Sequence, residues 1–293
     1  MNICNETPRR GATWIRSLFW VIALLVTASS AVYQRVTGPT YPLRGEVFVG
    51  GQAVSYELPR SADTAADATV RIDVPPGVSG KIVWRRYRTD DPYTEAGMVR
   101  DEKGLMAHLP AQPMAGKLQY HMVLEDGGEK VMVPPQGATV IRFKGHVPLW
   151  AMLPHILFMF LAMLLAARTA LEAIWNQGQL RCHAWWTFAF LIIGGFIFGP
   201  VVQHYAFGTW WSGVPFGWDL TDNKTLVALV AWLIAIVIIG VRRPIRARER
   251  WAAFIAVVVM LGIFMVPHSL YGSELDYSKL ESGVPVHEAI GSG

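Results

Sequence analysis

The amino-acid sequence predicts an α-helical membrane protein with five transmembrane helices and an inserted extracytoplasmic all-β domain, an immunoglobulin-like sandwich. The first reason is composition: 52% of the 293 residues are hydrophobic and 16% are charged, whereas about a quarter of the residues in soluble chains are charged. The second is that apolar residues gather in runs close to the roughly 20 residues that cross a bilayer. The third is a segment of alternating polar and apolar residues after the first run. This composition excludes a cytosolic enzyme, a disordered chain and a disulfide-rich secreted scaffold.

Five apolar runs are the predicted transmembrane helices, at residues 14–33, 149–167, 184–202, 226–241 and 251–267. The last four have no Lys, Arg, Asp or Glu in the middle, and His155 is the ionisable side chain expected at membrane depth. Four segments follow from these runs. They are the N-terminus with the first helix (1–33), the β domain (34–147), a four-helix transmembrane bundle (148–267) and a tail (268–293).

The first run has a second interpretation. Arg9 and Arg10 precede it, and Ser29-Ser30-Ala31 is a small-residue stretch of the kind found at signal-peptide cleavage sites. The run is longer than a typical signal core, which favours an uncleaved anchor. The remaining topology is the same in both interpretations.

Arginine-rich segments predict the orientation of the helices, because cytoplasmic loops are enriched in Lys and Arg. These arginines precede the first run or fall between runs two and three or four and five: Arg9, Arg10, Arg16, Arg168, Arg181, Arg242, Arg243, Arg246, Arg248 and Arg250. The N-terminus is therefore predicted to be cytoplasmic, and the β domain and C-terminus periplasmic, in a bacterial inner membrane. The expected partners are the lipid bilayer and membrane or periplasmic proteins, with no nucleic acid. Cys4 and Cys182 both fall on the cytoplasmic side, so no disulfide is expected.

Residues 34–147 are predicted to form the β-sandwich. Polar and apolar residues alternate in four stretches separated by Pro and Gly clusters: 68–74, 81–88, 117–124 and 138–143. Short alternating strands with turn clusters between them are typical of an immunoglobulin-like sandwich.

Four histidines converge on the outer face in this topology. His146 and His155 lie before and just inside the outer end of the second run, His204 follows the third, and His268 follows the fifth. Neutral imidazole ligates metals or relays protons. A histidine at the depth of His155 usually faces the bundle interior with a polar partner, although a packing histidine without a ligand remains an alternative. A solvated histidine is ordinary at a helix end, where His204 and His268 lie.

The loop 203–223 is rich in tryptophan, with Trp210, Trp211 and Trp218. Tryptophan also gathers at membrane interfaces, because its ring is apolar and its N–H prefers water. Asp219 and Asp222 precede an apolar helix and are interpreted first as a variant capping box at its N-terminus. Catalytic acid chemistry is the less favoured alternative.

Residues 207–211 read F-G-T-W-W, and residues 217–222 read G-W-D-L-T-D before the apolar helix. This loop resembles the tryptophan-rich haem-handling membrane proteins of cytochrome c assembly, whose outward loop reads W-G-x-x-W-x-W-D-x-x-[DE] between two histidines. The chain differs in having Phe207 at the first tryptophan and six residues, 212–217, before Trp218. The resemblance implies haem or a transition metal as cofactor. Its axial ligands would be His204 and His268, and its platform would be Trp210, Trp211, Trp218 and Asp219.

Two classes of function remain. The first is a haem- or metal-binding membrane protein whose ligands are His155, His204 and His268, serving cytochrome maturation or electron transfer. The second is a non-catalytic accessory subunit of a larger membrane complex, whose β domain docks an extracytoplasmic partner; this rests on fold analogy. C-x-x-C-H, H-E-x-x-H, P-loop and G-x-S-x-G patterns are absent from the sequence. No catalytic residue is identified, which leaves open whether the protein is an enzyme.

Overall fold

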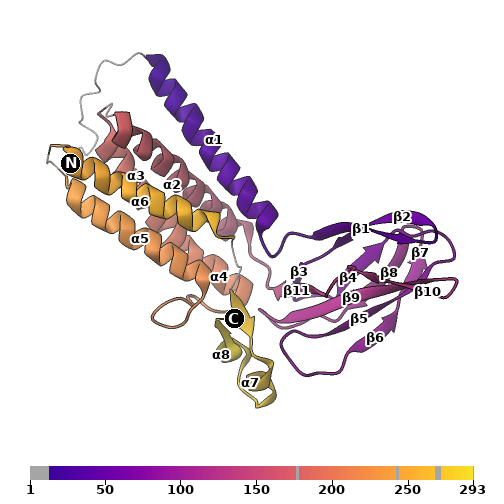
Figure 1. Ribbon diagram of the computed structural model, residues 1–293. Coiled ribbons are helices and arrows are strands. Elements are labelled where there is room, and N and C mark those ends of the chain that lie inside the picture. The colour runs from indigo at the N-terminus through magenta and orange to yellow at the C-terminus, as the bar shows by residue number, and fades with distance from the viewer. Residues whose placement is uncertain (1–12, 176–177, 242–243, 268–271, 293) are drawn as a thin grey trace. The chain divides into compact units, whose positions relative to one another are not determined.

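The computed structural model of the chain describes residues 13–175, 178–241, 244–267 and 272–292 (Figure 1). The chain divides into two compact units. The helical unit takes the described residues of 1–38, 147–204 and 210–272, and the β unit takes those of 39–146, 205–209 and 273–293.

Helices α1 to α6 and a π-helical segment, η1, belong mainly to the helical unit (Figure 1). Their bounds are α1 Thr13–Thr37, α2 Leu149–Trp175, α3 Leu180–Leu191, η1 Ile192–Phe198, α4 Gly199–Phe207, α5 Leu220–Ile239 and α6 Ala247–Met265. α3, η1 and α4 follow one another without a break and form one helical segment of 28 residues.

Four helical segments are long and apolar enough to cross a membrane by length and composition: Thr13–Thr37, Leu149–Trp175, Leu180–Phe207 and Leu220–Ile239. The predicted helical membrane part is confirmed to that extent, and these are the helices of a multi-pass membrane protein. α6, with 19 residues, begins with three charged residues, Arg248, Glu249 and Arg250. It is not among the four segments, and its role as a fifth span stays a prediction.

Alanines are eight of the fifteen buried residues in the apolar cluster of the helical unit, beside larger side chains such as Trp232. Ala162, Ala166, Ala228, Ala235, Ala253 and Ala256 are all buried and belong to one cluster. Small side chains let helix backbones approach closely, as in membrane bundles. Large apolar side chains such as Leu157, Val237 and Ile255 are exposed instead. Alanines at the helix contacts, together with large apolar side chains on the outer surface, fit helices surrounded by lipid.

Five of the ten arginines assigned to segments outside the apolar runs lie within helices: Arg16, Arg168, Arg181, Arg248 and Arg250. Arg168 is on α2 and Arg181 is in the first turn of α3, and both are buried. The prediction that they are loop residues is wrong, because α2 continues to Trp175 and α3 begins at Leu180. Arg181 donates from Nε to the Gly240 carbonyl at 3.2 Å, so its charge is held by the end of α5.

Cys182, in the first turn of α3, is disulfide-bonded. The expectation that the chain has no disulfide is therefore wrong. That expectation rested on the redox state of a predicted compartment, whereas a disulfide depends on two cysteines meeting in the fold. The other cysteine, Cys4, lies outside the described residues.

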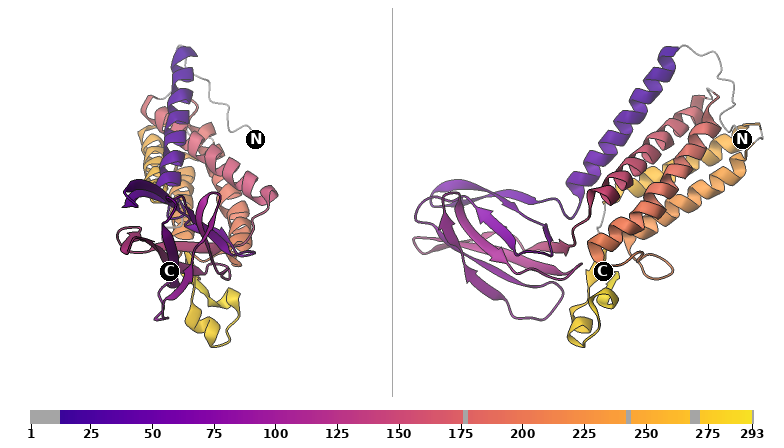
Figure 2. Two further views of the ribbon diagram at one scale, coloured as in Figure 1. Left: turned by 90° about the vertical axis from the view of Figure 1, so that its right-hand side faces the viewer. Right: turned by 180° about the vertical axis from the view of Figure 1, so that it is seen from behind.

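The β unit contains strands β1 to β11, shown in two further views in Figure 2. Their bounds are β1 Leu43–Val49, β2 Gln52–Leu58, β3 Ser61–Asp63, β4 Ala68–Ile72, β5 Ser79–Arg86, β6 Thr94–Gly97, β7 Val99–Asp101, β8 Gly104–Leu109, β9 Lys117–Asp126, β10 Glu129–Val133 and β11 Thr139–Lys144. The larger sheet has the order β3-β11-β9-β5-β6, with β10 also paired to β9. A second sheet has the order β4-β8-β7, and β1 pairs with β2. The prediction of a β domain is confirmed.

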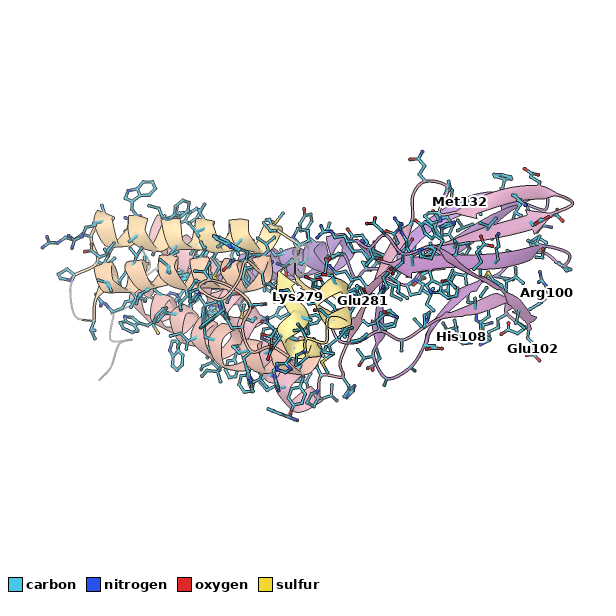
Figure 3. All side chains as sticks on the ribbon, turned by 90° about the horizontal axis from the view of Figure 1, so that it is seen from below. Arg100, Glu102, His108, Met132, Lys279 and Glu281 are labelled. Atoms are coloured by element: carbon cyan, nitrogen blue, oxygen red, sulfur yellow. The ribbon has the colours of Figure 1, made fainter. Side chains whose placement is uncertain are left out.

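The four stretches predicted to alternate overlap β4, β5, β9 and β11. In β9, alternate residues from Leu118 to Leu124 are buried, and they join one apolar core with residues of the other sheets. Arg100 on β7 (Figure 3) stabilises the turn between β4 and β5. Its guanidinium donates to the carbonyls of Val74, Pro75 and Val78 at 3.2, 3.1 and 2.5 Å.

The described part of the C-terminal tail is integrated into the β unit. It forms β12 Ser273–Leu275, α7 Tyr277–Glu281, α8 Val286–Ala289 and β13 Ile290–Ser292. Glu274 forms an ion pair with Lys117 of β9, and Glu281, labelled in Figure 3, pairs with Arg86 of β5 at 2.5 Å. The buried Tyr277 hydroxyl accepts from the Lys117 N–H at 3.0 Å and donates to Gln112 Oε1 at 3.0 Å. Burial raises the pKa of Tyr277 to about 12, so this phenol keeps its proton at neutral pH.

Candidate functional site

The predicted site residues that the structure describes all belong to the helical unit. They are His155 on α2, His204 on α4, and Trp210, Trp211, Trp218 and Asp219 on the loop before α5. His268 lies outside the described residues, and His146 belongs to the β unit. We refer to residues 208–219 as the Trp-rich loop.

His155 has a defined polar partner. Its Nδ1 lies 2.8 Å from the carbonyl oxygen of Gly194, on η1. A carbonyl oxygen only accepts, so we assign the proton to Nδ1 and a lone pair to Nε2. The expectation that a histidine at this depth has a polar partner is confirmed. The partner is a backbone group of the π-helical segment, a type of segment that is frequent at functional sites.

Two glycines bring η1 close to its neighbours. A Cβ added at Gly194 would lie 3.0 Å from the backbone N and Sδ of Met159 on α2. One added at Gly195 would lie 2.8 Å from Cγ2 of Thr225 on α5. Only glycine therefore allows α2, η1 and α5 to pack at this distance, and this packing brings the Gly194 carbonyl to His155.

His204 stacks on Trp210. The ring centroids are 4.2 Å apart and the planes differ by 7°, so the two rings lie nearly parallel and in contact. Trp210 is exposed on the Trp-rich loop. The stack fixes the orientation of the imidazole by a contact between the end of α4 and the loop that follows it.

Asp222 holds the Trp-rich loop against the first turn of α5. Its buried carboxylate accepts from the N–H groups of Ser212 at 2.6 Å and Gly213 at 3.1 Å, and from Nε2 of Gln203 at 3.0 Å. The next residue, Asn223, accepts from the Val214 N–H at 2.8 Å. Side chains of α5 thus accept hydrogen bonds from the backbone N–H groups of the loop, which belongs to no helix or strand.

Asp219 is the N-cap of α5. Its buried carboxylate accepts from the N–H groups of Thr221 at 2.7 Å and Asp222 at 3.3 Å. The capping interpretation is confirmed for Asp219 and satisfies N–H groups that a helix start leaves open. Asp222 does not complete a capping box, because its carboxylate binds the loop backbone. Both carboxylates are occupied by structural hydrogen bonds.

The tryptophans of the loop have different surroundings. Trp211 stacks on Phe196 of η1, with centroids 5.5 Å apart, and its Nε1 donates to the Val214 carbonyl at 3.2 Å. Trp218 is 77% exposed and Phe216 is 82% exposed. Trp211 therefore anchors the loop, while Phe216 and Trp218 present apolar rings outward. Phe216 was missed by the sequence analysis, which counted only tryptophans.

Lys224 was also missed as a structural residue of this region. It is buried in the second turn of α5, and its Nζ donates to the Val266 carbonyl, at the end of α6, at 3.1 Å. The signal in the sequence is a lysine just before an apolar run.

The structure brings part of the predicted set together. Among the residues that it describes, no group of three or more His, Cys, Asp or Glu side chains is arranged to hold a metal ion. His155 and His204 are the predicted ligands that lie within the described part of the chain. The fold is that of a multi-pass helical membrane protein with a β unit. No protein-family model matches the chain, and no curated protein matches it.

Proposed function

We propose that the protein binds haem or a transition metal at the end of the helical unit that carries the Trp-rich loop, and that it serves cytochrome maturation or electron transfer. The observation that carries this proposal is the hydrogen bond from His155 Nδ1 to the Gly194 carbonyl. Histidines that ligate metals almost always donate the other ring N–H to a carbonyl, carboxylate or water. This bond leaves Nε2 of His155 as the ligating atom.

His204, oriented by its stack on Trp210, would supply a second imidazole, and His268 a third. Phe216 and Trp218 offer exposed rings to the apolar faces of a porphyrin. Asp219 is assigned to helix capping and is not a ligand in this proposal. A bound haem iron or copper ion would supply one-electron redox chemistry.

Absorption and metal analysis test the proposal. The full-length protein, expressed with a haem precursor and purified in detergent, should show a Soret band or bound iron or copper. The band should be lost when His155→Ala and His204→Ala are combined. His287→Ala is the matched control, because His287 is an exposed histidine of α8 and its removal should change nothing. Wild-type protein that stays colourless and metal-free after incubation with haem, Fe²⁺ and Cu²⁺ would contradict the proposal.

The alternative is an accessory subunit whose β domain docks an extracytoplasmic partner. One observation favours it: Phe48, next to the turn that joins β1 and β2, is 75% exposed. Large exposed aromatic side chains are enriched where proteins meet partners. Phe48→Ser should then remove a partner that co-purifies in stoichiometric amount with the full-length protein. Val99→Ser, at another exposed apolar residue of the same unit, is the control. Purification of the wild type alone under mild extraction would argue against this role.

The finer topology is also part of the proposal. α6 would be the fifth span, the N-terminus cytoplasmic, and the immunoglobulin-like β domain and the C-terminus periplasmic, in a bacterial inner membrane. The support is that α6 buries Ala253, Ala256 and Met260 in the core and exposes Trp251 and Ile255. Alkaline phosphatase fused after Gly293 should be active, because five spans place the two termini on opposite sides. An inactive phosphatase with a fluorescent green fluorescent protein fusion would indicate an even number of spans.

A further inference from the structure

A second polar cluster lies on α2, away from the candidate site. Arg168 follows His155 by thirteen residues, roughly 20 Å along a helix at about 1.5 Å per residue. Its Nη2 pairs with Oε1 of Glu172, one turn further on, at 2.7 Å, and both side chains are 0% exposed. Ionised side chains within apolar helices are rare, and they mark functional sites by default.

Two donors of the Arg168 guanidinium lack acceptors. Within the described residues, neither Nε nor Nη1 has a hydrogen-bond partner. An arginine stays protonated even when buried, so these N–H groups cannot be neutralised by losing a proton. A buried donor without an acceptor is costly, and Nε and Nη1 point in different directions from the nitrogen that faces Glu172. A single ligand that satisfied both groups would need more than one acceptor atom.

Aromatic rings of α1 cover Arg168. The guanidinium carbon lies 5.2 Å from the ring centre of Phe19 and 5.6 Å from that of Trp20. His183 of α3 packs edge-on against Trp20, with centroids 5.6 Å apart and planes at 89°. Its Nδ1 is buried and, in the described part of the chain, has no hydrogen-bond partner. Nitrogens of α2 and α3 that have no hydrogen-bond partner among the described residues therefore belong to side chains that both contact Trp20, and Trp20 is itself exposed.

Arg16 and Glu172 are charged neighbours of Arg168. Arg16 of α1 lies close enough to Arg168 for their charges to repel, and Glu172 is the carboxylate that attracts Arg168. Glu172 also accepts from the N–H of Gln179 at 3.4 Å through its other oxygen. Glu172 is therefore shared between Arg168 and a backbone N–H group, and it leaves Nε and Nη1 of Arg168 without a hydrogen bond to any residue that the structure describes.

We propose that Arg168 and His183 bind a phosphate group, either on the headgroup of an anionic phospholipid or as free phosphate. Arginine is the residue best suited to phosphate, because its several fixed donors match several phosphate oxygens. Basic residues near a membrane surface attract anionic lipid headgroups.

Thermal unfolding of delipidated full-length protein in detergent tests this inference with three probes: phosphatidylglycerol, inorganic phosphate and the phosphate-free glycolipid monogalactosyldiacylglycerol. The wild-type midpoint should rise with a phosphate-bearing probe and not with the glycolipid. A response to phosphatidylglycerol alone identifies a lipid headgroup as the source. A response to inorganic phosphate as well identifies a site for phosphate itself.

The test variant replaces Arg168→Met and Glu172→Met together, so that no unpaired charge stays buried. Its apparent affinity for the phosphate-bearing probe should fall ~10-fold or more, as expected for the loss of charge-assisted hydrogen bonds. Arg248→Gln is the matched control, because Arg248 is an exposed arginine paired with Glu249. This variant should respond as the wild type does.

His183→Phe keeps the aromatic packing and removes both ring nitrogens, and should also weaken the response. If the double variant does not fold, the response of His183→Phe tests the inference in its place. The inference is wrong if the wild type responds to neither phosphate-bearing probe, or if the double variant, or His183→Phe in its place, responds as strongly as the wild type. Bound phosphorus measured by ³¹P NMR after purification provides a second readout, and should be present in the wild type and reduced in the variants.

Discussion

Glu172→Gln alone should destabilise the helical unit by about 3–5 kcal/mol, the usual cost of removing one partner of a buried ion pair. The substitution preserves side-chain size but leaves the guanidinium of Arg168 without its counter-charge. Both side chains are fully buried, so water cannot take the place of the carboxylate. Replacing Arg168→Met and Glu172→Met together removes both desolvation costs and should restore most of the lost stability.

Unfolding of the full-length protein in mixed micelles without added phospholipid, followed by circular dichroism, measures these changes. Arg168→Met, Glu172→Met and the double variant form, with the wild type, a thermodynamic cycle that isolates the energy of the pair. Glu281→Gln is the control, because the pair of Glu281 with Arg86 is near the surface and should contribute at most about 1 kcal/mol. Equal losses in Glu172→Gln and Glu281→Gln would show that the α2 pair is solvated.

The helices could be predicted from the sequence because their apolar runs are long, but their ends could not. The second predicted run ends at Ala167, immediately before Arg168, and the third begins after His183. Hydropathy treats a charged residue as the end of a span. In the structure, Arg168 and Glu172 pair within α2, and Arg181 and His183 are buried in the first turn of α3. Hydropathy along the sequence does not show which charged side chains find partners inside the helical bundle.

The candidate site was predictable where its contacts are local. The cap formed by Asp219 involves the next three residues, and the pattern of an aspartate before an apolar run indicated it. The contact of His155 with Gly194 joins residues 39 apart in the chain. It depends on the π-helical segment and on glycines that let helices approach. The inward position of Trp211 likewise depends on Phe196, on another element. Such contacts depend on how the helices pack, and the spacing of residues in the sequence does not indicate them.

Asp222→Ala should release the Trp-rich loop and lower the stability of the helical unit by about 3 kcal/mol, because each hydrogen bond to a charged group contributes about 1.5–3 kcal/mol. The Ser212 and Gly213 N–H groups, which now donate to Asp222, would lose their acceptor. Hydrogen exchange of residues 210–218 should therefore become faster. Gly213→Ala tests the same contact from the loop side, since its Cβ would lie 2.7 Å from the Cβ of Asp222.

Asn223→Ala is the matched control for Asp222→Ala. It removes one acceptor, that of the Val214 N–H, and should cost about 1 kcal/mol, the usual contribution of a neutral hydrogen bond. Asp222→Ala and Asn223→Ala also test whether the position of the loop matters for ligand binding. If Phe216 and Trp218 form the wall of a ligand site, Asp222→Ala should weaken ligand binding while His155 and His204 remain in place. Wild-type exchange rates at Ser212 and Gly213 in Asp222→Ala would show that Asp222 does not hold the loop.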